Sequence, residues 1–200
     1  MKILITGFGP FNSFSFNPSE VVAKSLSEEN EDVESRILPV VYGKGGKALL
    51  DSLEEFDPDL IICFGLNGNI SHIALEEVAL NLRSSEIPDS SGRIFEDQPI
   101  TTEGQLAYRT ELPVIRIRKE LRKKGIPAKL SYCAGTYLCN EVFYTLMTWC
   151  SHHSKRGGFI HIPMASELIA DDPKSYSIPH MSMEMILQAG RIILAVSRFR

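Results

Sequence analysis

Apolar residues along this chain follow two spacings, which alternate from one end to the other. Short runs of consecutive apolar, often β-branched residues predict buried strands, and apolar residues three or four apart predict amphipathic helices. The predicted strands span residues 2–6, 34–41, 60–64, 73–82, 128–133 and 158–163. The first predicted helix starts at residue 18, with Asn17 as its cap, and the others span 44–56, 112–124, 138–149 and 181–198.

Strands that alternate with helices over most of a chain indicate an α/β protein. We expect a three-layer α/β/α sandwich around a mixed, mostly parallel, twisted sheet. Two hundred residues fit one domain with a single core, and no internal repeat or linker divides residues 1–200. Because open α/β sheets bind ligands at the carboxyl ends of their strands, the loop at 65–69 is a candidate part of a site.

The segment at 73–82 carries a carboxylate on an apolar face. If it is extended, Glu76 lies on the side of Val78 and Leu80, and Glu77 lies on the other side. A carboxylate on an apolar face is costly unless it has a partner. The pattern leaves two readings open, a partnered internal Glu76 or an antiparallel edge strand with Glu76 in solvent. The polar segment at 84–106, predicted as an irregular loop, is long enough to suggest a functional role.

The composition excludes several classes of protein. A net charge of −4 gives no electrostatic basis for binding nucleic acid or an anionic membrane. No apolar run approaches the roughly 20 residues of a membrane helix, and Gly7, Gly9 and Pro10 interrupt the first run before it resembles a secretory signal. The four cysteines lack C-x-x-C spacing, so we expect free thiols in a reducing cytoplasm.

Among the cysteines, Cys139 has the setting of a nucleophile, because it falls in the first turn of a predicted helix. Unpaired N–H groups and the positive end of the helix dipole favour a thiolate there. Cys63 and Cys133 fall inside predicted buried strands, and Cys150 lies at a helix end where the dipole has the wrong sign. The alternative, an inert buried cysteine at position 139, stays open at this point.

Among the histidines, His161 is the best candidate for a base, because it ends an apolar strand. A histidine there can equally be a satisfied core residue. His72 lies at a loop-to-strand boundary, His180 precedes a helix, and the remaining two lie in a predicted polar loop at 151–157. We find no metal-binding spacing, phosphate loop, dinucleotide fingerprint or G-x-S-x-G elbow, so no metal or cofactor is expected.

Several blocks of this sequence resemble, in order and spacing, the motifs of the pyroglutamyl peptidase type I family. The nucleophile motif A-G-T-x-x-C-N and the histidine motif G-F-I-H-[IV]-P are both present in full. The resemblance covers essentially the whole chain. The matching blocks are residues 4–11 (LITGFGPF), 17–19 (NPS), 76–81 (EEVALN), 87–89 (IPD) with Gly92, 134–140 (AGTYLCN) and 158–163 (GFIHIP).

The resemblance implies a cysteine exopeptidase that removes an amino-terminal pyroglutamyl residue from peptides. By this resemblance Cys139 is the nucleophile, His161 the general base and then acid, and Glu76 the residue that orients the imidazole. It further implies a cytoplasmic enzyme, without metal or cofactor, that assembles as a homotetramer. Aromatic faces can sandwich the flat lactam ring while backbone groups bind its N–H and C=O. The implied pocket residues are Phe8, Phe11, Leu66, Asn67, Tyr137 and Leu138.

Three features depart from the family pattern. The loop after the third predicted strand is altered by Asn67, Asn69 and Ile70, and Glu141 stands where the family often has histidine. Glu86 stands where the family has an arginine that is thought to assist the oxyanion region. Loss of one oxyanion donor costs on the order of a hundredfold or more in rate in other enzymes. Glu86 and the altered loop motivate an alternative, a catalytically weakened relative that binds peptide amino termini or a lactam metabolite.

Overall fold

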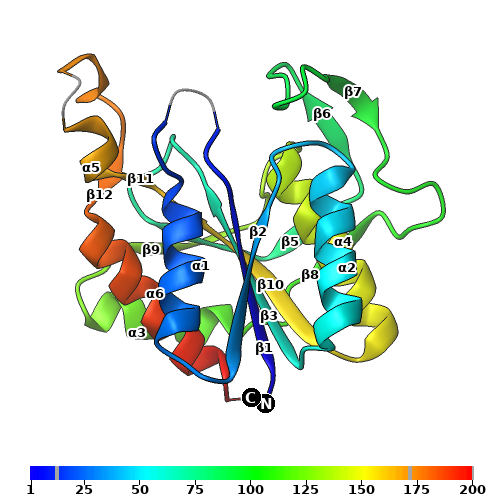
Figure 1. The fold of residues 1–200 in the computed structure, drawn as a ribbon, viewed down its shortest axis with the longest axis horizontal. Helices are drawn as coiled ribbons and strands as arrows, with labels where there is room; N and C mark the ends of the chain where they lie inside the picture. The colour runs from blue at the N-terminus through cyan, green and yellow to red at the C-terminus, as the bar shows by residue number, and fades with distance from the viewer. Residues whose placement is uncertain (12–13, 171–172, 200) are drawn as a thin grey trace.

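A six-stranded sheet forms the centre of the computed structural model, which describes residues 1–11, 14–170 and 173–199 (Figure 1). The strand order is β2-β1-β3-β10-β4-β9. The first four strands in this order are parallel, whereas β4 is antiparallel to β10 and parallel to β9. The mixed, mostly parallel sheet predicted from the sequence is confirmed. The strands are β1 (Ile3–Phe8), β2 (Val33–Leu38), β3 (Leu60–Leu66), β4 (Ile73–Glu76), β9 (Ala128–Ser131) and β10 (Arg156–Ile162).

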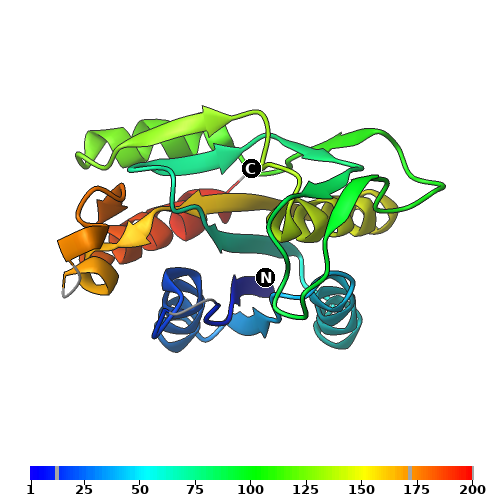
Figure 2. The ribbon, with the colours of Figure 1, turned by 90° about the horizontal axis from the view of Figure 1, so that it is seen from above.

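Helices cover both faces of the sheet, which confirms the three layers (Figures 1 and 2). α1 (Pro18–Glu28), α3 (Val114–Lys123) and α6 (Met183–Ser197) pack on one face, and α2 (Lys44–Phe56) and α4 (Leu138–His153) pack on the other. Successive strand residues point to opposite faces, so Ile5 and Ile62 belong to the first core and Leu4 and Ile61 to the second. Asn17 caps α1 as predicted, its side chain accepting from the Ser19 N–H.

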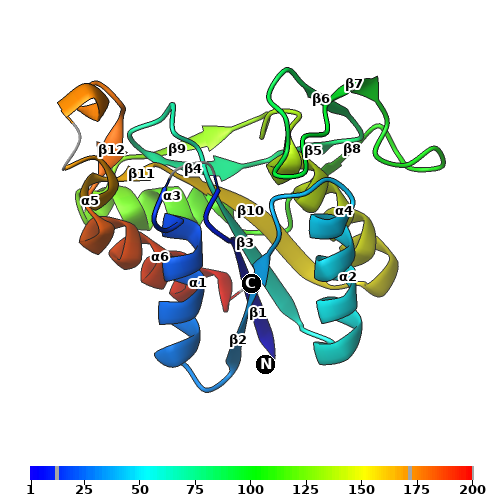
Figure 3. The same cartoon turned by 45° about the horizontal axis from the view of Figure 1, so that its top comes forward.

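In the described parts of the chain, three pairs of short strands lie outside the main sheet. β5 (Val78–Leu80) pairs with β8 (Ala107–Arg109), and β6 (Arg83–Ser85) pairs with β7 (Phe95–Gln98). Both pairs lie above α4 at the upper right of Figure 3. The third pair, on the opposite side of that view, is β11 (Met164–Ala165) with β12 (His180–Met181), and the chain between these two strands includes α5 (Ser166–Ile169) and η1 (Pro173–Ser175).

Several local predictions are corrected by the structure. The predicted strand at 73–82 breaks at Glu77, where the chain leaves the main sheet, and the segment at 84–106 contains the β6–β7 hairpin instead of being wholly irregular. β9 ends at Ser131, so Cys133 is exposed and does not lie inside a buried strand. The prediction of a loop at 151–157 is wrong at both of its ends. α4 continues through His153, and β10 begins at Arg156.

The start of the chain and the end of α6 lie on the same side of the molecule, at the bottom of Figure 1. Arg156 contacts both: one guanidinium nitrogen donates to the Ser197 carbonyl at 3.2 Å, and the other lies 3.7 Å from the Met1 sulfur. The carboxyl ends of β1, β3 and β10 lie at the opposite edge of the sheet. Within the described residues, no helix has the length and apolar character needed to cross a membrane.

Candidate active site

Glu76 and His161 meet on neighbouring strands of the main sheet. In the antiparallel β4–β10 ladder Glu76 lies opposite Phe159, so Glu76 and His161 are diagonal neighbours on one face. The His161 Nδ1 and Glu76 Oε1 atoms are 2.8 Å apart, and the residues are only 3% and 1% exposed. β4 is an interior strand, so the reading of Glu76 as a solvated edge residue is wrong. Glu77 points the other way and pairs with Arg109 at 2.6 Å.

The charges around His161 favour its protonated form. Burial lowers the pKa of His161, but negative charge on the Cys139 sulfur, its hydrogen bond to the ring and the Glu76 carboxylate outweigh burial and raise that pKa from 6.5 to about 10. Because Glu76 occupies Nδ1, Nε2 is the nitrogen that remains for Cys139. The second oxygen of Glu76, Oε2, is buried and has no hydrogen-bond partner among the described residues.

Cys139 lies in the first turn of α4, as the sequence predicts. Tyr137 precedes this helix as its N-cap residue and provides no side-chain cap, so the first backbone N–H groups remain available to an anion. The thiol also lies directly over β3. A Cβ atom added at Gly65 would lie 2.9 Å from the Cys139 sulfur and 2.6 Å from Cζ of Phe159. Glycine at position 65 therefore makes room for the thiol.

The other three cysteines have different surroundings. Burial raises the pKa of the Cys63 thiol to about 12, and it raises the pKa of Cys150 to the same value, so both are protonated at neutral pH. Cys133 is exposed, and its sulfur lies 3.9 Å from the Gly135 carbonyl oxygen. Cys139 alone among the four combines partial exposure with a histidine contact.

Two polar residues that follow the thiol fix the start of α4, and the sequence reasoning did not assign them a role. The Asn140 side chain accepts from the Leu80 N–H at 2.9 Å and donates to the Leu80 and Leu82 carbonyls at 2.8 and 2.9 Å. Glu141 accepts from the Gly43 N–H at 2.6 Å and pairs with Arg83 at 2.5 Å. Asn140 and Glu141 are 0% and 1% exposed. Polar residues at core-facing helix positions are the signal that could have revealed them.

The six pocket residues implied by the resemblance lie in different surroundings. Phe8 is buried at the end of β1, and Phe11 and Tyr137 are half-buried against the same core. Leu138 is 1% exposed and belongs to the core, so only its backbone can face a ligand. Leu66 ends β3 and is half-buried. Asn67 follows it and lines a cavity beside Glu76.

The segment that carries Glu86 is held to the loop before α2 through Asp89. The Asp89 carboxylate accepts from the N–H groups of Tyr42, Ser91 and Arg93 at 2.8 to 2.9 Å. Burial opposes ionisation, but these donors outweigh it and hold the pKa of Asp89 well below its ordinary value. Glu86 itself is exposed. The guanidinium of Arg83, the nearest arginine before Glu86 in the chain, forms an ion pair with Glu141.

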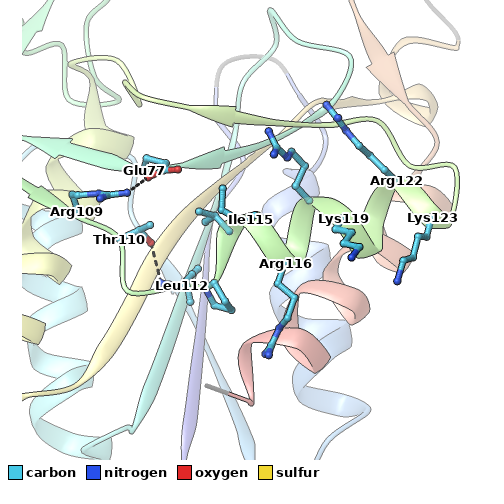
Figure 4. Close-up of a pocket in the computed structure, with 12 residues that line it drawn as sticks. Glu77, Arg109, Thr110, Leu112, Ile115, Arg116, Lys119, Arg122 and Lys123 are labelled. Carbon is cyan, nitrogen blue, oxygen red and sulfur yellow. Dashed lines mark hydrogen bonds and ion pairs between the residues drawn. The ribbon is translucent and has the colours of Figure 1, made fainter.

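Two cavities help to locate the site. One of about 570 Å³ lies beside Glu76 and is lined by Asn67, His72 and Lys129 among others. A larger one of about 1000 Å³ runs along α3, where Figure 4 shows Ile115 and several basic side chains together with the Glu77–Arg109 ion pair. The lining of the larger cavity includes no cysteine and no histidine, and the three proposed reacting groups lie elsewhere. The larger cavity is therefore not the candidate active site.

Comparison with known proteins gives the family. The family model for pyroglutamyl peptidase matches residues 1–198. The chain belongs to the pyroglutamyl peptidase family. It is 39% identical over 203 residues to a pyrrolidone-carboxylate peptidase of Brachyspira hyodysenteriae, with all of both chains covered. It is 41% identical over 207 residues to the Pyrococcus furiosus protein of the same name, with 98% of each covered.

Solved structures of pyroglutamyl peptidases share the fold. A mutant pyrrolidone carboxyl peptidase from Pyrococcus furiosus superposes with a TM-score of 0.93 at 40% identity, covering 99% of this chain and 98% of that one. Pyroglutamyl peptidase I from Bacillus amyloliquefaciens gives a TM-score of 0.93 at 38% identity, covering 100% and 95%. This chain is therefore a member of a hydrolase family of the cysteine-peptidase type, and it has the family's fold over its full length.

Proposed function

We propose that this protein removes amino-terminal pyroglutamyl residues from peptides, with Cys139, His161 and Glu76 as a catalytic triad. The observation that carries the proposal is the hydrogen-bonded pair of His161 and Glu76, with the Cys139 thiol on the same imidazole. Membership of the pyroglutamyl peptidase family supplies the substrate class.

The first half of the reaction forms an acyl-enzyme. The Cys139 thiolate attacks the pyroglutamyl carbonyl carbon, and the carbonyl electron pair moves to oxygen. The free N–H groups at the start of α4 stabilise this oxyanion. The oxyanion then collapses, the C–N bond breaks, and protonated His161 gives its proton to the leaving amine. The raised pKa of His161 suits this step, because the ring holds a proton at neutral pH.

The second half returns the enzyme to its starting state. Neutral His161 removes a proton from water, the resulting hydroxide attacks the thioester carbonyl, and the C–S bond breaks with the electron pair returning to sulfur. Glu76 holds the ring by Nδ1 throughout and stabilises its charged form. Phe8, Phe11 and Tyr137 supply apolar surface for the lactam ring, and the backbone around Leu66, Asn67 and Leu138 supplies polar contacts.

The alternative, a weakened relative that binds without turnover, rests on Glu86 and is less well supported. Glu86 is exposed, and all three reacting side chains of the proposed mechanism are retained. Calorimetric binding of pyroglutamate by a protein without peptidase activity would favour this alternative. Activity gained by Glu86→Arg would then identify the residue responsible.

The proposed function is tested with a fluorogenic pyroglutamyl amide. We expect Cys139→Ser to lower kcat/KM by at least about a thousandfold. Cys133→Ser, which changes an exposed thiol close by in the chain, should keep the wild-type rate and serves as the matched control. Equal losses in both variants, or no hydrolysis by the wild-type protein, would contradict the proposal.

The resemblance to the family also carries expectations about assembly and location. We include a cytoplasmic location and a homotetramer in the proposal. Cell fractionation tests the location, and sedimentation velocity of the purified protein tests the assembly. A stable monomer at the working concentration would remove the tetramer from the proposal without affecting the catalytic groups.

A further inference from the structure

The cavity beside Glu76 is an extension of the candidate active site. It has a volume of about 570 Å³ and lies over β4 and β9, where Ala74, Glu76, Lys129 and Ser131 share one face of the ladder. The opposite face of these strands packs against α3. Glu76 itself is one of the residues that line this cavity. The cavity therefore borders the triad directly.

The order of strands decides which part of a substrate would enter this cavity. Along the sheet, Phe8 lies on β1, Cys139 lies over Gly65 of β3, His161 lies on β10, and the cavity lies over β4 and β9. The pyroglutamyl ring is assigned to the Phe8 side. Because His161 protonates the leaving nitrogen, the leaving peptide lies on the imidazole side of the thiol. The residue after pyroglutamate then points toward the cavity.

Lys129 gives the cavity a positive charge. It is exposed on the edge strand and forms no ion pair with any carboxylate in the described part of the chain. His72 lines the same cavity, and burial, followed by the nearby charge of Lys129, lowers the pKa of His72, so its ring is neutral at pH 7. Glu76 is already paired with His161. Lys129 is therefore the cation available to a ligand in this cavity.

We propose that the cavity binds the residue that follows pyroglutamate and that Lys129 selects a carboxylate there. This inference rests on the proposed function. The carboxylate can come from an acidic side chain at that position or from the carboxyl terminus of a pyroglutamyl dipeptide. Both sources present the same group to the ammonium of Lys129.

The test compares substrates that differ only after the pyroglutamyl residue. Release of pyroglutamate is followed by chromatography for pyroglutamyl-Glu, -Ala and -Lys amides and for pyroglutamyl-alanine with a free carboxylate. We expect the wild type to have a kcat/KM about threefold higher for a carboxylate-bearing substrate than for the alanine amide, the size expected for an exposed ion pair. The Glu amide and the free dipeptide report the two sources separately.

Variants assign the preference to one residue. Lys129→Ala should abolish the preference for carboxylate, and Lys129→Glu should reverse it in favour of the lysine amide, while hydrolysis of the alanine amide is retained. Lys124→Ala changes an exposed lysine outside the cavity and should keep the wild-type preference. If the wild type and the Lys129 variants hydrolyse the substrates with the same ratios of kcat/KM, this inference is overturned and the proposed function is not. If the wild-type protein hydrolyses none of the four substrates, both the proposed function and this inference are overturned.

Discussion

Replacing Gly65 by alanine tests the position of the thiol more specifically than removing the thiol itself. The added Cβ atom would lie 2.9 Å from the Cys139 sulfur and 2.6 Å from Phe159 Cζ. Ordinary contacts between heavy atoms are about 3.5 to 4.0 Å, so the sulfur must move by about 0.6 to 1.1 Å or the strand must yield by that amount. A misplacement of about 1 Å in an active site can cost about a hundredfold in rate.

We therefore expect Gly65→Ala to lower kcat by about a hundredfold with a folded protein. The overpacking itself should cost about 1 to 3 kcal/mol of the free energy of unfolding, which a domain of this size tolerates. The assay is hydrolysis of the fluorogenic pyroglutamyl amide, with circular dichroism melting to measure the folded fraction.

Gly68→Ala is the matched control for this prediction. Gly68 lies three residues further along, in the loop after β3, and its added Cβ would meet nothing closer than the Met164 Cε atom at 3.7 Å. We expect a wild-type rate for this control. If Gly65→Ala also hydrolyses the substrate at the wild-type rate, Cys139 over β3 is not the nucleophile and the reasoning is refuted.

Three further predictions concern the groups around the thiol. Because the pKa of His161 is raised to about 10, kcat/KM should be lost on the alkaline side near pH 10 instead of near pH 6.5. Glu76→Gln should move this loss of activity to lower pH. If the profiles of wild type and variant from pH 5 to 11 coincide, Glu76 does not have this role. Asn140→Ala removes the hydrogen-bond partner of three backbone groups, two in β5 and one just after it. This variant should lower the free energy of unfolding by about 3 kcal/mol in urea titrations, and a change below about 1 kcal/mol would contradict the prediction. Arg83→Met leaves the Glu141 charge buried and should cost about 3 kcal/mol in the same measurement, whereas a double variant that also carries Glu141→Gln should recover part of the loss.

The reacting groups could be located from the sequence to different degrees. Cys139 and His161 lie at the ends of elements that hydrophobic periodicity marks well, a helix start and a strand end. Glu76 was ambiguous, because periodicity gives the face of a strand and not its neighbour in the sheet. Its interior position follows from pairing between β4 and β10, two segments more than eighty residues apart in the chain. Only the tertiary structure gives that pairing.

The local errors also have physical causes. The strand at 73–82 breaks at Glu77, because β9 pairs with β4 only as far as Ser131 and the residues after Glu77 pair with β8 instead. The Asn140 side chain takes the backbone groups of Leu80 and Leu82 on the side away from β8. Cys133 ends the segment that the sequence predicts as a strand, but β9 pairs with β4 only as far as Ser131. Side-chain bonds to a distant backbone and the length of a partner strand leave no trace in the spacing of apolar residues.

The start of the chain and the end of α6 lie on the same side of the molecule, so the order of the chemical groups along the chain is not required by the fold. Arg156 contacts residues near both ends at the edge of the sheet remote from Cys139. Joining the ends with a short linker and opening the chain at the exposed positions 102–103 would give a circular permutant. Its sequence would present Cys139 and His161 first and Glu76 last, on an unchanged sheet. Such a permutant separates what the chemistry needs, a spatial arrangement, from the sequence order in which this chain supplies it.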